Sequence, residues 1–170
     1  NKNEVKIFSR TGDDISLSFP EIENNQEKMV ILDGELLVGK NYIPMNFNSL
    51  QQRINRKKVS KKHLIDYPAF IKLYDILFLD NIDLRDVPWK LRRKKLEEWF
   101  LTNKNQYFDL SEVMKFKEWK DLENIKKFKI IDEEHEGLMI KRIEGPYISG
   151  RPKGHWFKWK KEPKTVDAIL

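Results

Sequence analysis

The sequence predicts an α+β protein in which strands and helices are interspersed along one domain. Short apolar runs typical of strands occupy Met29–Val38, Ala69–Asp80, Gly137–Ile143 and Trp156–Lys161. Apolar residues at helical spacing occur between these runs, over 89–100 and again over 121–128. At 170 residues and 39% hydrophobic content, the chain is long enough for about one domain with a real core.

Composition narrows the classes of function. The net charge of +6 suits a polyanionic partner, although many basic proteins have none. The absence of cysteine excludes disulfides, thiolate metal sites and a cysteine nucleophile. No signal-peptide pattern and no membrane-length apolar run are present, so we expect a soluble cytoplasmic protein without a membrane partner.

The first segment alternates polar and apolar residues. Residues 4–10 predict a strand, 11–14 a turn and 15–19 a second short strand. The chain starts almost directly in this strand pattern and stops at VDAIL, which resembles the start of another strand, so we expect both ends to be cut. On this pattern alone, Ser9 and Arg10 lie on an exposed hairpin.

An acidic pair interrupts the apolar run Met29–Val38. Asp33 and Glu35 are two residues apart and therefore share a strand face, and Gly34 between them would let a ligand approach closely. Carboxylates inside an apolar strand are unfavourable unless they are paired, hydrogen-bonded or metal-bound. The pair therefore predicts a functional site.

Later segments predict helices and one further strand. Asn46 or Asn48 is expected to cap one helix, and Asp86 another that has Pro88 in its first turn. A third helix is predicted to begin at Ser111. The cations at 53–62 and 90–95 are interpreted as solvated. In the strand over 69–80, alternation places Tyr74, Ile76 and Phe78 on one face and Asp75 with Leu73, Leu77 and Leu79 on the other.

The last two apolar runs flank a connector rich in glycine and proline. Lys158 and Lys160 are expected on one face, with Phe157 and Trp159 pointing into the body, which predicts an anion site and most simply a phosphate site. Glu136 opens the first of these strands and is a candidate metal ligand. The alternative is a solvated basic edge strand. Lys141 is five positions after Glu136, so a regular strand places the two on opposite faces unless a bulge intervenes.

These residues carry a family resemblance. EGLMIK followed by WFKWKK resembles nucleotidyltransferase motifs IV and V of the ATP-dependent DNA ligases. FSRTGDDISLSFPEI, LDGEL, NFNSLQQRINRK and LYDILFLDNIDLRD also match, in order. The resemblance is closest to bacterial ligases, in a superfamily that also holds RNA ligases and mRNA-capping guanylyltransferases.

The resemblance implies a fold and a division of the chain. The fold is a partial covalent nucleotidyltransferase fold, with antiparallel sheets flanked by helices and the nucleotide between them. Residues 1–161 would form the adenylation domain, truncated at its N-terminus. Residues 162–170 would form a linker and the start of an oligonucleotide-binding-fold domain.

The resemblance also implies roles for individual residues. Glu35 would serve the nucleotide ribose or the metal, and Tyr74 would stack on the adenine. The other nucleotide-binding positions are Glu136, Lys141, Lys158 and Lys160, of which the last two contact phosphate. Glu35 and Glu136 would hold Mg²⁺ or Mn²⁺, and the DNA-binding residues would be Ser9, Arg10 and Arg151.

The implied reaction adenylates the enzyme with ATP, passes AMP to the 5′-phosphate of nicked duplex DNA, and seals the nick. Because this reaction acts on DNA, the resemblance also implies that the protein is located at the nucleoid. The adenylated lysine belongs to a K-x-D-G motif, and the only Asp-Gly pair here, Asp33-Gly34, follows Ile31-Leu32. We therefore expect the polypeptide alone to be inactive in self-adenylation, and apolar surface left by missing strands to favour self-association. An RNA ligase, a capping enzyme and a non-catalytic DNA-binding module are the alternatives.

Overall fold

The computed structural model describes residues 5–23, 29–54, 56–129, 137–150 and 153–160. Its elements are a 3₁₀ turn η1 (Ser16–Ser18), β1 (Val30–Lys40), β2 (Ile43–Pro44), α1 (Phe47–Gln51), α2 (Lys61–Asp66), β3 (Ala69–Leu79), β4 (Ile82–Asp83), α3 (Trp89–Asn103), β5 (Phe108–Leu110), α4 (Trp119–Lys129), β6 (Gly137–Lys141) and β7 (Trp156–Lys160). The predicted α+β class is confirmed. No helix in the described ranges is both long and apolar enough to cross a membrane.

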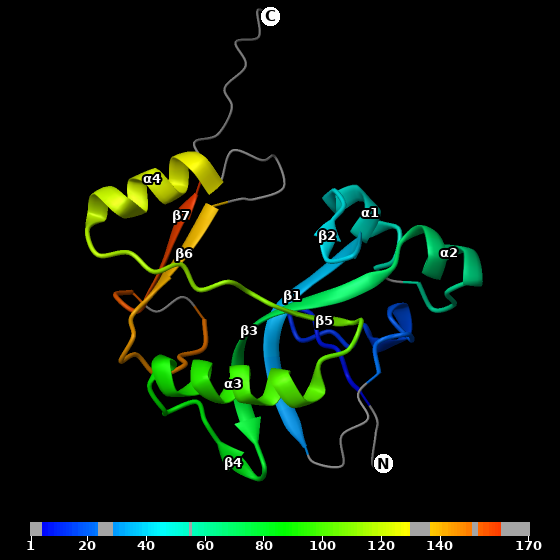
Figure 1. Cartoon of the computed structure of the whole chain (residues 1–170). Helices are drawn as coiled ribbons and strands as arrows, with labels where there is room; N and C mark the ends of the chain where they lie inside the picture. Colours follow the sequence, from blue (N-terminus) through cyan, green and yellow to red (C-terminus); the bar gives the residue numbers. More distant parts are fainter. Residues whose placement is uncertain (1–4, 24–28, 55, 130–136, 151–152, 161–170) are drawn as a thin grey trace, which may run out of the picture.

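Two sheets make up the β structure (Figure 1). The main sheet has the order β2-β1-β3-β4, with β5 pairing β3 in parallel, so one pairing departs from the predicted antiparallel arrangement. The long hairpin of β1 and β3 runs from Val30 opposite Leu79 to Val38 opposite Ala69. Within the described residues, the second sheet consists of β6 and β7.

Tight two-residue turns close the two short hairpins of the main sheet. Asn41 and Tyr42 join β1 to β2, and Asp80 and Asn81 join β3 to β4, all four with positive φ. Such left-handed pairs match the twist of a β-hairpin. The Tyr42 hydroxyl donates to the Asn105 carbonyl at 2.8 Å, which helps to hold a non-glycine residue in this conformation.

Two register shifts interrupt the pairing of β1 with β3. Asp33 and Gly34 pair with Asp75 and Leu73, which leaves Tyr74 as the extra residue of a bulge, and Leu77 is skipped in the same way. The predicted alternation in β3 is therefore wrong. Leu73 and Ile76, assigned to opposite faces by a period of two, are both buried in the core.

The core lies where α3 packs against β3 (Figure 1). Leu96 and Trp99 of α3 are buried, and Trp99 meets Phe108 of β5 edge-to-face with ring centroids 5.7 Å apart. Phe19 and Ile22 complete the cluster from the N-terminal segment. The apolar face predicted for this helix is thereby confirmed at its centre.

The N-terminal segment forms a bridge and a 3₁₀ turn in place of the two predicted strands. Phe8 and Asp14 make one isolated bridge, and the predicted turn between them is confirmed by a 2.8 Å bond from the Ser9 N–H to the Asp13 carbonyl. The Ser16 hydroxyl accepts from the Ile7 N–H, and Asp14 accepts from Ser16. These side chains thus form hydrogen bonds with backbone N–H groups that would otherwise be available to pair with a second strand.

Helix starts differ from the prediction at two of four places. Asn46 caps α1 by accepting from the Ser49 N–H, as expected, and α4 covers the helix predicted near 121–128. Asp86 does not cap α3, whose N-cap is Pro88. No helix begins at Ser111, because its N–H donates to the Leu73 carbonyl and keeps the chain beside β3.

Arg53 is fully buried, although its charged neighbourhood predicts a solvated side chain. Its guanidinium donates to the carbonyls of Tyr67 and Ser18, at 2.6 and 2.7 Å, and to Glu21 at 2.8 Å. It also lies over the ring of Phe19. One side chain thus joins the N-terminal segment, α1 and the start of β3.

Candidate nucleotide site between the two sheets

The β6–β7 hairpin presents a row of cations on one face. The register pairs Lys141 with Trp156, Met139 with Lys158 and Gly137 with Lys160, and directly paired residues point the same way. Lys158 and Lys160 therefore share a face with Lys141, and both are exposed. Phe157, on the opposite face, is 54% exposed, so the prediction that it points into the body is wrong.

Lys141 fills a cage between the two sheets. Its ammonium nitrogen lies 4.7 Å from the ring centroid of Tyr74 and 4.8 Å from that of Trp156, and 3.4 Å from Oδ2 of Asp75. Burial lowers the pKa of Lys141, and Asp75 opposes that shift by favouring the charged form. Sequence alone left the direction of Lys141 open; the structure turns it towards β3.

The Asp75 carboxylate that contacts Lys141 belongs to a fully buried ion pair with Arg92. Asp75 accepts from Nε and Nη2 of Arg92 at 2.8 and 3.0 Å, and its Oδ1 also accepts from the Ile76 N–H at 3.0 Å. Arg92 donates further to the carbonyls of Val87 and Gly145. The interpretation of Arg92 as solvated is wrong. The available signal was Asp75 itself, because a carboxylate inside an apolar strand needs a cation or hydrogen-bond donors.

Asp33 is held by two tyrosine hydroxyls. Tyr74 donates to its Oδ1 and Tyr147 to its Oδ2, each at 2.8 Å. Burial and the neighbouring Asp33 carboxylate raise the pKa of both tyrosines. The anomaly of Asp33 in an apolar strand is thus resolved by hydrogen bonds. Tyr147 was not among the predicted residues, because no spacing links the connector to β1.

Glu35 lies next to this network on β1. It is exposed and stands opposite Lys72, which forms a 3.3 Å ion pair with Asp109. A Cβ on Gly34 would meet the side chain of Ile71 at 2.6 Å. The structure therefore shows a close approach of β3 at Gly34.

The remaining predicted residues lie elsewhere or outside the described ranges. Ser9 bonds to Thr11 and Asp13 within its turn, and Arg10 is exposed there. Hydrogen bonds from Thr11 and Ser9 lower the pKa of Asp13. This segment lies across β1 and β3 from the β6–β7 hairpin (Figure 1). Glu136, Arg151 and residues 162–170 lie outside the described residues.

Fold and site together define a nucleotidyltransferase-like class, with a cationic hairpin facing an aromatic and acidic sheet. The family described as "ATP dependent DNA ligase domain" matches residues 1–160, and the chain belongs to it. The resemblance carried by the motifs is thereby confirmed.

Similar curated proteins include archaeal DNA ligases. The DNA ligase of Methanosphaera stadtmanae is 29% identical over 173 residues, covering 99% of this chain and 31% of that protein. The DNA ligase of Methanobrevibacter smithii is 31% identical over 180 residues, covering 100% and 32%. The chain thus spans about a third of the length of these relatives.

Solved structures confirm the fold. The ligase domain from M. tuberculosis LigD superposes with a TM-score of 0.70 at 25% identity, covering 92% of this chain and 47% of that one. A mycobacterial DNA ligase D complexed with ATP and MES gives a TM-score of 0.69 at 23% identity, covering 91% and 47%. The predicted nucleotidyltransferase fold is confirmed by this likeness.

Proposed function

We propose that the chain is the nucleotide-binding part of an ATP-dependent DNA ligase, which seals nicks through enzyme–AMP and DNA–adenylate intermediates. One observation carries the proposal: Lys141, on the cationic face of β6 and β7, has its ammonium nitrogen 4.7 Å from the ring of Tyr74 on β3. Ammonium groups on a rigid strand suit a triphosphate, and an aromatic side chain beside them suits a purine. Family membership supports ATP as the nucleotide.

Within this site the residues divide by chemistry. Lys158 and Lys160 would bind the nucleotide phosphates and stabilise charge that develops on the α-phosphate. Tyr74 would stack on the adenine, and Glu35 would bind the ribose or the metal. Lys141 is buried in its cage and would act at the floor of the site.

A divalent cation fits this proposal. The described residues hold no group of three or more acidic or histidine ligands. Mg²⁺ is commonly held by one or two carboxylates together with substrate phosphates and water, so such a group is not required. Glu35 and Glu136 would supply the carboxylates, for Mg²⁺ or Mn²⁺. The ion would act as a Lewis acid and as a template for the phosphates.

The test compares ligands that differ only in phosphate. By calorimetry, the chain should bind ATP more tightly than adenosine, and Lys158→Ala should weaken ATP binding by on the order of tenfold while adenosine binding is kept. Lys153→Ala, an exposed lysine of the connector, is the matched control and should change neither. Equal affinity for ATP and adenosine would contradict the proposal.

Self-adenylation requires a lysine that this chain does not place in a K-x-D-G motif. The 170-residue polypeptide should therefore bind ATP without forming a covalent lysine–AMP. Incubation with radiolabelled ATP and Mg²⁺ followed by denaturing electrophoresis measures this. A labelled band that survives denaturation would overturn the expectation.

The nucleic acid is tested separately. A fusion of this chain with the remaining parts of a ligase of the family, including a K-x-D-G segment, should seal nicked duplex DNA and not a nicked RNA duplex. Arg10→Ala and Arg151→Ala should weaken DNA binding and reduce its salt dependence, since both are proposed phosphate contacts. Preferential sealing of RNA would favour an RNA ligase.

A further inference from the structure

We propose that Asp75 and Arg92 are positioning residues, which together with Lys141 fix the tilt of the β6–β7 hairpin and so the placement of Lys158 and Lys160. The inference rests on the proposed function, because it concerns the face that would bind phosphates. We call the cluster of Asp75, Arg92 and Lys141 the hub.

The main-sheet side of the hub is rigid. Asp75 is fully buried on β3, and Arg92 is fully buried on α3. The carboxylate accepts from two guanidinium nitrogens and from the Ile76 N–H, so both of its oxygens have fixed donors. A carboxylate held by a two-pronged guanidinium and a backbone donor cannot rotate freely.

Two contacts join the β6–β7 hairpin and its connector to the hub. Lys141, at the end of β6, lies 3.4 Å from Oδ2 of Asp75 and has a side chain only 10% exposed. Arg92 donates to the carbonyl of Gly145 in the connector at 3.4 Å. One carboxylate and one guanidinium thus hold both the strand and the connector that follows it.

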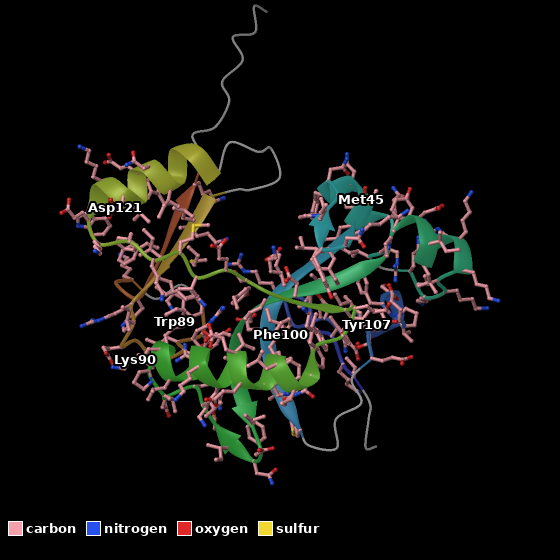
Figure 2. All side chains as sticks on the ribbon, in the orientation of Figure 1. Met45, Trp89, Lys90, Phe100, Tyr107 and Asp121 are labelled. Carbon is pink, nitrogen blue, oxygen red and sulfur yellow. The ribbon has the colours of Figure 1, made fainter. Side chains whose placement is uncertain are left out.

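The start of α3 makes further contacts with the connector. Its N-cap, Pro88, makes no side-chain capping bond, so the first backbone N–H groups need other acceptors. The N–H groups of Trp89 and Lys90 donate to the carbonyls of Gly145 and Ile143, at 2.8 and 3.0 Å. Figure 2 shows Trp89 and Lys90 at the end of α3 nearest to β6 and β7.

A tilt of the hairpin about the hub would displace the far end of β7. Trp156 pairs with Lys141 at the hub, and Lys160 is four residues further along β7. At roughly 3.3 Å per residue this is about 13 Å, so a tilt of about 10° at the hub moves Lys160 by about 2 Å. Tyr74 and Asp33 lie on the main sheet, so a tilt of the hairpin should leave their backbone in place. Loss of the hub should therefore affect phosphate binding more than base binding.

The experiment uses the 170-residue chain and two measurements. Hydrogen exchange reports the docking of the hairpin without any ligand, and calorimetry compares ATP with adenosine. In Asp75→Asn, amides of β6 and β7 should exchange at least about tenfold faster while β1 and β3 keep their protection. ATP affinity should fall by on the order of tenfold and adenosine affinity by less than about twofold.

The matched control removes another ion pair, which joins α3 to the connector. Lys90 and Glu144 are joined at 2.6 Å but are exposed, so Lys90→Ala should leave both measurements unchanged. If Asp75→Asn does not fold, hydrogen exchange of β6 and β7 in Lys141→Met tests the inference instead. This substitution removes only the ammonium group at the edge of the hub.

Two results would overturn the inference: unchanged exchange of β6 and β7 in folded Asp75→Asn or Lys141→Met, or an equal loss of ATP and adenosine affinity in Asp75→Asn. A wild-type chain that does not distinguish ATP from adenosine would refute the proposed function instead. The exchange measurement would then still decide whether the hub positions the hairpin.

Discussion

Removal of the Arg53 guanidinium should destabilise the protein strongly. The side chain is fully buried, and it donates to two backbone carbonyls and to a carboxylate whose side chain is 13% exposed. Arg53→Met keeps most of the aliphatic stem and deletes all of these bonds. Because Glu21 then keeps a mostly buried charge without its cation, the expected loss in free energy of unfolding is about 3 to 5 kcal/mol.

A second substitution separates the charge from the packing. In the double variant Arg53→Met, Glu21→Gln the unpaired carboxylate is absent, so we expect about 1 to 2 kcal/mol of the loss to be recovered. Urea unfolding followed by circular dichroism measures both differences. Lys94→Met, at an exposed i,i+4 pair with Glu98, is the control and should cost less than about 0.5 kcal/mol.

The reasoning would be refuted if Arg53→Met cost less than about 1 kcal/mol, the size of a surface change. It would also be refuted if Glu21→Gln added a further loss in the double variant. Either result would show that the guanidinium is not the common partner of the N-terminal segment and the start of β3.

Three further predictions concern the tyrosine pair and the backbone. Tyr74 and Tyr147 have raised pKa values, so above pH of about 10 the unfolded state loses protons that the folded state keeps, and stability should fall as pH rises. Absorbance at alkaline pH should show Tyr74 and Tyr147 titrating late, and these two should titrate earlier in Asp33→Asn. Asn81→Gly should raise the free energy of unfolding by up to about 1 kcal/mol, because φ is 66° there and glycine adopts this left-handed conformation without steric cost, and thermal unfolding measures it. Gly34→Ala should cost about 1 to 3 kcal/mol, since its Cβ would meet a β3 side chain at 2.6 Å; no change in the urea midpoint would show that β3 shifts freely.

Local patterns predicted the elements whose sequence signal is strong. The apolar runs that became β1 and β3 are long and contain β-branched and aromatic residues, and the face of α3 repeats at helical spacing. Such periodicities depend only on near neighbours along the chain. The shared face of Lys158 and Lys160 follows from the same period-two rule and is present in the hairpin.

Prediction failed where a contact from a distant part of the chain decides the outcome. A period of two cannot place Tyr74, because the bulge depends on how β1 pairs with β3. Arg92 and Arg53 resemble surface cations until their partners are known, and these lie 17 and 32 residues away in the sequence, at Asp75 and Glu21. Ser111 has a helix-like sequence, but its N–H is taken by β3.

The sequence by itself determined the fold class, the family and the cationic face of the last hairpin, because each depends on residue types at short spacing. Only the tertiary structure decided which carboxylates are committed to structure and which way Lys141 points. Asp33 and Asp75 meet their donors across more than one element, on β3, α3, β6 and the connector. A buried charge is stable only beside its partner, and the fold alone determines which partner is within reach.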